Sequence, residues 1–411
     1  MMRRHWAFYL SCLLAFTGGH MVNYSVIIYA QEVLQSDLLS GIGFGLCFGP
    51  PLLLGWYAGV LCDRHAPVNI IHFAQTLFVL AALVLVLGDR IVADPAARAP
   101  FVLGAALLAG IGWSFAAPAR MTTLGQIAGT DMLRQASLLF NLLVMLGFGL
   151  GPLAISLCRI GFGWPAVFTM AVVLSGAGSL LLLRTASRAG GKPHRRIRDE
   201  VGEGMSAVRA NPLIAQLLAS AVLGYTLMGP MQVLLPKIAR SELGLSELER
   251  GAFLGALAPS LIAGGLLCLF IARLLPHGKT ILAALAISGV LFAWMANTHA
   301  AAIAAMLLAG VGIMGGIAIS LIVAGIQENV EDTVRGRVLS MYTIISQSVP
   351  AASGLAAGVL AHALTTRGAM LTCGIALAVA VLLNAGYLRA LRQYRGMVKR
   401  VRTDSAFSDG I

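Results

Sequence analysis

The tetrapeptide DMLR at residues 131–134 has a counterpart, DTVR, at residues 332–335, which lies 201 residues further along the chain. Each copy precedes a long apolar run that contains one interior proline, Pro152 in the first run and Pro350 in the second. The same signal at equivalent places indicates an internal duplication in parallel orientation, a plan known from membrane proteins that consist of two similar halves. The repeat therefore predicts two halves that share one fold.

The composition places both halves in a membrane. Of the 411 residues, 58% are apolar and only 11% are charged, whereas soluble domains carry about 25% charged residues. This balance excludes a cytosolic enzyme, a disulfide-rich secreted domain, a coiled coil and a disordered scaffold. Stretches without Asp, Glu, Lys or Arg are long enough for membrane helices, which need about 20 apolar residues each.

Eleven such stretches follow one another, and residues 280–327 have twice the length of one span, with a break from Asn297 to His299. The first stretch is too long for the apolar part of a signal peptide, and no cleavage site follows it, so we count it as a retained helix. We therefore predict an all-α membrane protein with twelve transmembrane helices in two six-helix halves. The charge-free stretches are residues 5–31, 38–62, 65–88, 99–119, 135–158, 160–183, 210–236, 251–272, 280–327, 338–366 and 368–388.

A long hydrophilic segment, residues 185–209, divides the chain. Its Gly-Gly pair and Pro193 favour a flexible link, and its later part, from Asp199 to Arg209, favours a short helix on the anionic membrane surface. The predicted divisions are an N-terminal half, a cytoplasmic linker, a C-terminal half and a basic cytoplasmic tail, at residues 1–184, 185–209, 210–388 and 389–411.

Basic residues are unevenly divided between the two sides of the predicted helices. With the N-terminus in the cytoplasm, 22 of the 29 Lys and Arg residues fall in cytoplasmic segments and seven fall in outer loops. Cytoplasmic loops of membrane proteins carry such an excess, so both termini are expected in the cytoplasm. The formal charge of +12 is then a topology signal, and we expect no nucleic-acid partner. The residue usage favours a bacterial inner membrane.

The sequence lacks motifs for metal binding, disulfides or catalysis. The six cysteines are scattered singly in or beside apolar runs, which is typical of small buried side chains. The sequence GVGIMG at residues 310–315 matches a dinucleotide fingerprint, but it lies inside a charge-free span with no strand before it. We therefore expect no metal, no cofactor and no enzymatic activity. A membrane enzyme and a non-transporting sensor are nevertheless kept as alternative classes of function.

The loop GVLCDRHAPV at residues 59–68 resembles the loop signature G-x-x-x-D-R-x-G-R-R of the major facilitator superfamily. Gly59, Asp63 and Arg64 match this signature, whereas the last three loop positions replace its second glycine and its basic pair. A carboxylate here can lie against the N-terminal end of a neighbouring helix, whose dipole favours negative charge. The resemblance implies a latch that closes the cytoplasmic side in one conformation. We assign to the same latch the arginines in and beside the repeated tetrapeptides, Arg134, Arg335 and Arg337.

Three longer stretches are similar to the branch of that superfamily that includes the enterobactin exporter and related drug:proton antiporters. They lie at residues 118–152, 203–244 and 327–342, and the third, QENVEDTVRGRVLSMY, is the most specific. The first ends in LGFGLGP, which is similar to the antiporter motif of fifth spans although the last glycine pair of that motif is missing. Small residues allow close helix approach and proline bends a span. We therefore expect a rocking interface at Gly147, Gly151 and Pro152.

Polar side chains within the predicted spans are the candidates for a substrate and proton pathway. His20 lies near the middle of the first span, with Asn23 and Tyr24 at helical spacing on one face. No charge falls inside a predicted span, since Arg120 is counted in a cytoplasmic loop, and an unperturbed histidine titrates near about pH 6.5. His20 is therefore the best proton carrier, with a neutral, hydrogen-bonded histidine as the alternative. The resemblance implies that spans one, four, seven and ten line the cavity, and the further candidates are Trp113, Asn141, Tyr225, Gln232 and Gln347.

These features together favour a proton-coupled secondary transporter that exports a small molecule across the inner membrane by alternating access. A siderophore or a drug-like metabolite is the expected substrate, the proton gradient is the energy source, and the lipid bilayer surrounds a monomer. A proton-coupled importer is the first alternative, because the fold implied by the resemblance runs in either direction. The acids at span ends are interpreted as interfacial charges, with gating or proton relay as the other interpretation: Glu32, Asp37 and Glu328.

Overall fold

The computed structural model describes residues 5–183, 185, 187–189 and 197–396. Every secondary-structure element among these residues is a helix. The N-terminal half consists of α1 (Trp6–Glu32), α2 (Asp37–Phe48), α3 (Pro50–Arg64), α4 (Pro67–Ile91), the short η1 (Ala96–Arg98) and α5 (Ala99–Leu180).

The linker helix α6 (Ile197–Ala210) leads into the C-terminal half. A short helix was expected at this place, and its presence is confirmed. The C-terminal half consists of α7 (Pro212–Tyr225), α8 (Met228–Lys237), η2 (Ile238–Glu242), α9 (Glu247–Gly255), α10 (Leu257–Leu274), α11 (His277–Met295), α12 (Ala301–Asn329), α13 (Asp332–Ala363), α14 (Thr366–Ala385) and α15 (Arg389–Gln393).

The element α5 is a succession of three helices. Its backbone is interrupted at Gly129 (φ 66°) and Gly163 (φ 70°), which both lie in the left-handed region that glycine reaches without a Cβ clash. The first interruption precedes the tetrapeptide at residues 131–134, which therefore opens the next helix and does not form the loop expected from its charges. The second lies beyond Arg159, the residue at which the charge pattern ended the fifth span.

Eleven helices in the described part of the chain are long and apolar enough to cross a membrane. One of them, Gln135–Leu180, has 46 residues and would measure about 69 Å as a single helix, more than twice the thickness of a bilayer core. It is the one that Gly163 interrupts, so it makes two crossings. The described chain thus crosses twelve times, and the predicted all-α membrane fold is confirmed.

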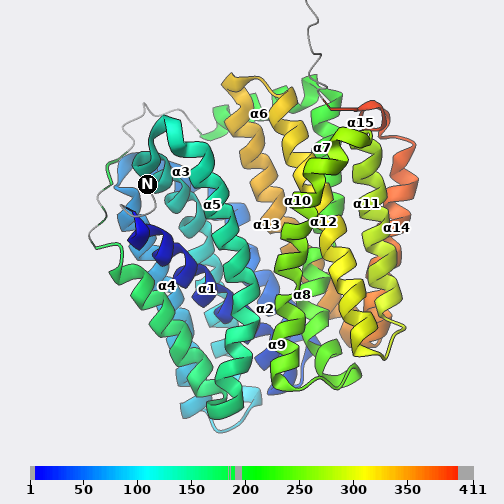
Figure 1. Ribbon diagram of the computed structural model, residues 1–411. Helices are drawn as coiled ribbons and strands as arrows, with labels where there is room; N and C mark the ends of the chain where they lie inside the picture. The colour runs from blue at the N-terminus through cyan, green and yellow to red at the C-terminus, as the bar shows by residue number, and fades with distance from the viewer. Residues whose placement is uncertain (1–4, 184, 186, 190–196, 397–411) are drawn as a thin grey trace, which may run out of the picture.

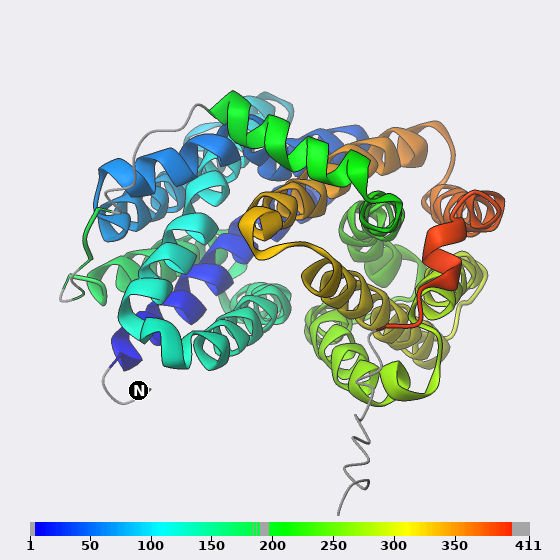
Figure 2. The same cartoon turned by 90° about the horizontal axis from the view of Figure 1, so that it is seen from above.

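The two halves lie side by side as two helix bundles (Figure 1), and α6 extends across them when they are viewed from above (Figure 2). Both ends of the described chain lie toward the same end of the molecule as α6, and we call it the termini end. The opposite end, which includes the first turn of α9 and the connection between α1 and α2, is called the far end.

Polar caps fix the starts of two helices in the C-terminal half. Asn211 accepts hydrogen bonds from the backbone N–H groups of Leu213 (3.0 Å) and Ile214 (3.4 Å), so it satisfies two free donors at the start of α7. At the far end, Ser246 and Glu249 form a capping box at the start of α9. The box orders the turn that carries ion-pairing side chains described below.

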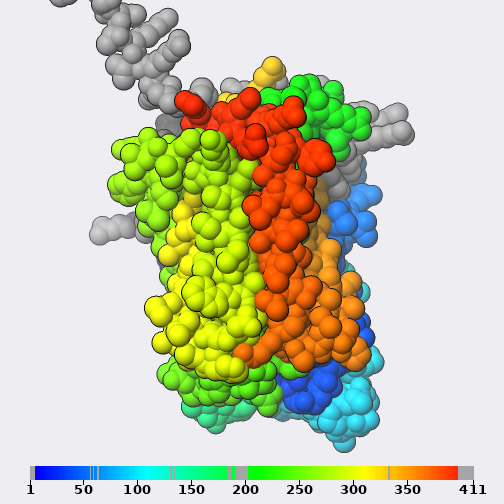
Figure 3. Space-filling view, turned by 90° about the vertical axis from the view of Figure 1, so that its right-hand side faces the viewer, coloured from blue at the N-terminus to red at the C-terminus, as the bar shows by residue number. Residues whose placement is uncertain are grey.

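Large apolar side chains face outward from the bundles. Figure 3 shows α11 and α14 side by side on one face, below α15 and α6. Phe270, Trp294, Leu382 and Leu383 are each more than half exposed. An exposed apolar surface of this extent is unusual in a soluble monomer, and it suits contact with lipid chains.

Candidate functional site

A cavity of about 360 Å³ lies between the two halves, and we call it the central cavity. Its wall combines hydroxyl, amide and guanidinium groups with apolar side chains, which suits a small molecule with polar and apolar parts. Met121 is 42% exposed, and Ser340 and Thr343 are also exposed, so the cavity communicates with the surface. Its lining comes from α3, α5, α6 and α13: Pro51, Gly55, Ser114, Ala117, Pro118, Met121, Gly204, Arg337, Ser340, Met341, Thr343, Ile344 and Gln347.

At the far end, the carboxylate of Glu32 connects the two halves. It lies 2.7 Å from Arg159 in its own half and 3.6 Å and 3.7 Å from Arg240 and Arg250 of the C-terminal half. Arg159 also lies 3.4 Å from Glu247, which in turn lies 2.7 Å from Arg250. The side chain of Glu32 is only 8% exposed, so water screens these charges less than it screens an exposed pair.

Two further contacts cross between the halves at this end. Lys237 at the end of α8 lies 2.5 Å from Asp37 at the start of α2. Beside this pair, Gln31 Nε2 donates a hydrogen bond of 2.7 Å to the backbone carbonyl of Val233. The ion pairs and this hydrogen bond hold α1 and α2 against α8.

Close helix packing completes the closure of the far end. A Cβ atom on Gly41 of α2 would lie 2.8 Å from the Cα atom of Gly358 on α13, so the two backbones touch. A Cβ atom on Gly149 of α5 would lie 3.0 Å from the carbonyl oxygen of Gly255 on α9. Glycine is required for such approaches. The far end is therefore closed, and the central cavity opens toward the termini end.

Four predicted pathway residues gather inside the N-terminal half. Trp113 Nε1 donates a hydrogen bond of 3.3 Å to Asn23 Oδ1, and the His20 ring lies 4.9 Å from the Trp113 ring. His20 and Tyr24 both pack against Phe148, at ring distances of 5.2 Å and 6.0 Å. His20 Nδ1 and Asn23 Nδ2 are buried without a hydrogen-bond partner among the described residues. This set forms a buried polar cluster behind the wall of the central cavity.

The buried Arg120 is a candidate functional residue that the charge pattern assigned to a loop. The fourth span continues to Gly129, so Arg120 lies within a helix and is fully buried. The prediction of a loop residue, and of spans without charge, is wrong. The absence of charge from residues 121–130 was a signal that the fourth span continues past Arg120, because these residues extend the apolar run by more than two helical turns.

The partners of Arg120 among the described residues are uncharged. Its Nη1 donates hydrogen bonds of 3.2 Å to both Ser11 Oγ and Cys12 Sγ, and its guanidinium carbon lies 5.6 Å from the centre of the Phe16 ring. Phe16 is stacked on Trp113 at 6.0 Å. The guanidinium is thus joined to the polar cluster through two aromatic rings, and its charge is not matched by an acid among these partners.

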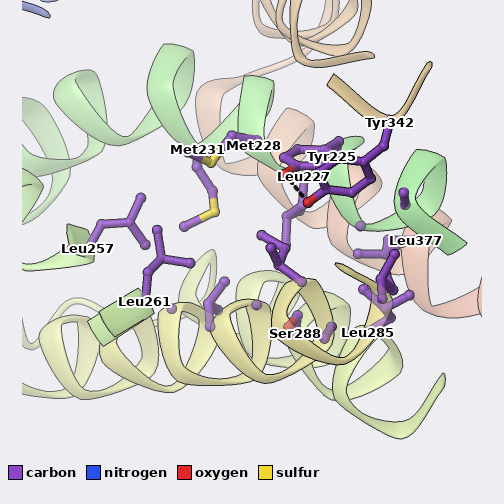
Figure 4. A pocket seen from close by; sticks show the side chains of 18 residues that line it. Tyr225, Leu227, Met228, Met231, Leu257, Leu261, Leu285, Ser288, Tyr342 and Leu377 are labelled. Atoms are coloured by element: carbon purple, nitrogen blue, oxygen red, sulfur yellow. Dashed lines mark hydrogen bonds between the residues drawn. The ribbon is translucent and has the colours of Figure 1, made fainter. Parts of the chain in front are cut away.

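Tyr225 lies in the other half, away from the polar cluster. Its hydroxyl shares a hydrogen bond of 2.8 Å with the hydroxyl of Tyr342 on α13. The two rings border a mostly apolar space of about 40 Å³ within the C-terminal half, which we call the side chamber (Figure 4). Gln232 is buried elsewhere on α8, and its Oε1 has no hydrogen-bond partner in the described part of the protein.

The remaining predicted pathway residues are separated. Gln347 lines the central cavity, whereas Asn141 is an exposed residue of α5 and is not part of its lining. The eight candidates are thus divided among the polar cluster, the side chamber, the central cavity and two single positions, so one contiguous site is not formed in this conformation.

The predicted latch residues are similarly dispersed. Arg337 lines the central cavity and forms an ion pair with Glu203 of α6, and Arg335 Nη2 donates a hydrogen bond of 3.2 Å to the carbonyl of Val330. Arg64 is exposed at the end of α3. At three latch positions the described structure covers the backbone alone: Gly59, Asp63 and Arg134.

The glycines of the fifth span face two different partners. Gly147 and Gly151 pack against α1 within the same half, where added Cβ atoms would lie 2.5 Å and 3.0 Å from the Cβ atoms of Phe16 and His20. Gly149 faces the C-terminal half, and Pro152 is buried within α5. Of these three glycines, Gly149 makes the contact between halves described above.

The C-terminal segment ties several helices together at the termini end. The Tyr394 hydroxyl donates a hydrogen bond of 2.6 Å to Glu328 Oε2, and the Leu391 N–H donates one of 2.8 Å to Gln216 Oε1. Burial raises the pKa of the Tyr394 phenol, and the adjacent Glu328 carboxylate raises it further. The phenol therefore stays neutral and serves as a donor. Glu328 is a hydrogen-bond acceptor of the C-terminal segment in this conformation.

Two similar bundles that enclose a cavity closed at one end define a membrane transporter, and not an enzyme. The chain belongs to the Major Facilitator Superfamily, whose family model matches residues 8–354. No curated protein sequence is similar enough to this chain to count as a relative.

Solved structures of transporters share the fold at low sequence identity. A POT family transporter in complex with 5-aminolevulinic acid superposes with a TM-score of 0.74 at 10% identity, over 95% of this chain and 96% of that one. A D-xylose-proton symporter gives 0.69 at 12% identity, over 91% and 96%. A bacterial homologue of the lysosomal transporter Spinster, in an inward-facing and unoccupied conformation, gives 0.66 at 17% identity, over 94% and 97%. These likenesses establish the fold alone.

Proposed function

We propose that this transporter exports a small molecule from the cytoplasm across a bacterial inner membrane, by alternating access and in exchange for protons. The observation that carries the proposal is the central cavity, which is closed at the far end by ion pairs between the halves and opens toward the termini end. With the termini in the cytoplasm, this conformation is the one that loads an exported substrate. The excess of basic residues on that side supports the orientation.

The wall of the central cavity supports an amphiphilic substrate. Ser114 and Gln347 offer hydrogen bonds, whereas Ile344 and the flexible side chains of Met121 and Met341 offer apolar surface. Arg337 is the basic residue of the lining, and its ion pair with Glu203 balances its charge. A neutral or zwitterionic molecule with polar edges suits this surface. The resemblance to the enterobactin-exporter branch supports a siderophore or a drug-like metabolite.

The polar cluster of the N-terminal half supports a role in proton coupling. His20 is the basic side chain of the cluster, and its Nδ1 is buried without a partner among the described residues. It packs against Trp113 of α5 and directly against Gly151, so a shift between α1 and α5 would change its surroundings. We assign the proton site to His20. A monomer suffices for the cycle, because one chain forms the whole cavity.

Inside-out membrane vesicles test the direction of transport. Cells that overproduce the protein yield vesicles whose outer surface is the former cytoplasmic face, and these are incubated with an extract of small metabolites from the same cells. We expect one or a few metabolites to accumulate when the lumen is acidic, and a protonophore to abolish the accumulation. The same metabolites are expected to be depleted from the culture medium of a deletion strain. Accumulation by right-side-out vesicles under an inward proton gradient would instead identify an importer.

A further inference from the structure

The internal repeat relates the side chamber to the central cavity. The residues of α5 that line the central cavity are Ser114, Ala117, Pro118 and Met121. The repeat offset of 201 residues converts these positions into Gly315, Ala318, Ile319 and Ile322 of α12, and all four line the side chamber. The offset is reliable here because the repeated tetrapeptides directly follow α12 and its counterpart in α5. The side chamber is therefore lined by residues of α12 that, by the repeat, would form a second wall of the central cavity.

The two tyrosines line the side chamber, and Tyr342 belongs to α13, the helix that borders both spaces. Tyr342 borders the side chamber, while its neighbours Met341 and Thr343 on α13 line the central cavity. The residue of the N-terminal half that corresponds to Tyr342 is Asn141, and the residue that corresponds to Tyr225 is Tyr24. Tyr24 packs against Phe148, and the hydroxyl-to-hydroxyl bridge seen in the C-terminal half has no counterpart there among the described contacts. Among the described contacts the bridge is therefore specific to the C-terminal half, and it lies in the wall of the side chamber, next to the residues of α13 that line the central cavity.

The interior of the side chamber is apolar and adaptable. Leu257, Leu261, Leu285 and Leu377 form much of its wall, together with Met228 and Met231 (Figure 4). The Ser288 hydroxyl is already engaged with the carbonyl of Ala284 at 2.9 Å. Methionine side chains change shape at low cost, so the space of about 40 Å³ can widen around a guest. An ion would lose its hydration in such surroundings without replacement.

We propose that the side chamber is an extension of the central cavity, shut off from it by the Tyr225–Tyr342 hydrogen bond, and that it binds an uncharged apolar group of the transported molecule. The group enters when the Tyr225–Tyr342 hydrogen bond opens, and the polar part of the molecule stays in the central cavity near Gln347. The inference rests on the proposed function, because it takes the central cavity as the transport route. It specifies the substrate class as an amphiphile with one apolar, uncharged end.

Cysteine reactivity in the two equivalent walls tests the proposal. The six native cysteines are replaced by alanine, and Ala318→Cys places a thiol in the side chamber. Ala117→Cys, at the position equivalent by the repeat, places one in the central cavity as the matched control. Each protein is reconstituted in phospholipid nanodiscs and treated with benzyl methanethiosulfonate, a neutral aromatic reagent, or with its trimethylammonium-ethyl analogue, a cation. Mass spectrometry measures the rate of labelling.

We expect Ala117→Cys to react with both reagents and Ala318→Cys to react with the neutral reagent only. Adding Tyr342→Phe removes one hydrogen-bonding hydroxyl and should accelerate the neutral reaction at Ala318→Cys about tenfold, with no change at Ala117→Cys. Tyr225→Phe is the second variant and should act in the same way. Equal labelling of Ala318→Cys by the cation, or rates that neither tyrosine variant changes, would overturn the proposal. An unreactive Ala117→Cys would instead contradict the central cavity and hence the proposed function.

Discussion

Asp37 in the N-terminal half and Lys237 in the C-terminal half form an ion pair of 2.5 Å between the starting turn of α2 and the last turn of α8. These residues lie 200 positions apart in the sequence, and no local pattern pairs them. Together with the contacts of Glu32, their pair connects halves that separate at the far end in the proposed alternating-access cycle. The charges are therefore placed to stabilise one conformation over the other.

Reversing the charge of Lys237 should weaken the closed far end. Lys237→Glu places two carboxylates together, and because a partly exposed ion pair contributes about 0–1 kcal/mol, we expect transport by inside-out vesicles to change by up to about fivefold. The double variant Asp37→Lys with Lys237→Glu restores the attraction and should recover the wild-type rate. If the double variant behaves as the sum of its single changes, the pair does not act as a gate.

A large side chain at Gly149 should prevent the halves from closing. Its Cβ atom would lie 2.7 Å from Ala258 Cβ and 3.0 Å from the Gly255 carbonyl, so Gly149→Leu forces α5 and α9 apart. We expect transport to fall at least about tenfold, since this overlap exceeds what side-chain adjustment relieves. The control is Gly161→Leu, because no atom lies within 4 Å of a Cβ atom at that glycine. Equal transport by both variants would contradict the role of Gly149.

Removal of the charge of Arg120 should lower transport without lowering the stability of the protein. A buried guanidinium with uncharged partners is costly to desolvate, so Arg120→Met should leave the thermal unfolding temperature unchanged or raised. Transport should fall at least about tenfold, because ionisable groups within a membrane are usually kept for function. Arg120→Lys keeps the charge but loses the planar fork that reaches both Ser11 and Cys12. Full transport by Arg120→Met, with a lowered unfolding temperature, would assign the residue a structural role only.

Replacement of His20 should impair coupling to protons. His20→Ala removes the titratable ring from the polar cluster, and we expect proton-driven transport to decline between about pH 6 and 8, while the amount of protein in the membrane stays the same. Exchange of substrate across vesicles without a pH gradient is the control, and it should continue because the central cavity is intact. Wild-type rates across that pH range would show that His20 does not carry the proton.

Much of the fold could be predicted from the sequence, because a membrane span is defined by the absence of charge over about 20 residues. The same rule gave wrong span ends where contacts between helices bury a charge or where a glycine interrupts a helix. Arg120 is buried against Ser11 and Phe16, so a charge did not end the fourth span. Backbone breaks at Gly129 and Gly163 determine the turns within α5. Such breaks could not be predicted from the sequence, because many other glycines lie within the apolar runs without interrupting a helix.

The candidate site was predictable only where one helix carries it. Helical spacing placed His20, Asn23 and Tyr24 on one side of α1, and these residues do lie in one buried cluster. The partners on other helices, such as Tyr342 for Tyr225, follow from how α13 packs against α7, and sequence spacing has no information about that packing. The side chamber could be related to the central cavity only from the structure, which shows the residues that line each space.

Electron-spin distances at the two ends of the molecule test alternating access most directly. One pair of labels reports the far end from Ala96→Cys and Ala300→Cys, and another reports the termini end from His65→Cys and Arg273→Cys; all four positions are exposed. Glu32→Gln leaves Arg159, Arg240 and Arg250 without their shared carboxylate, so their mutual repulsion favours opening. We predict that this variant gains a longer far-end distance and a shorter termini-end distance together. Unchanged distances, or lengthening at both ends, would contradict alternating access.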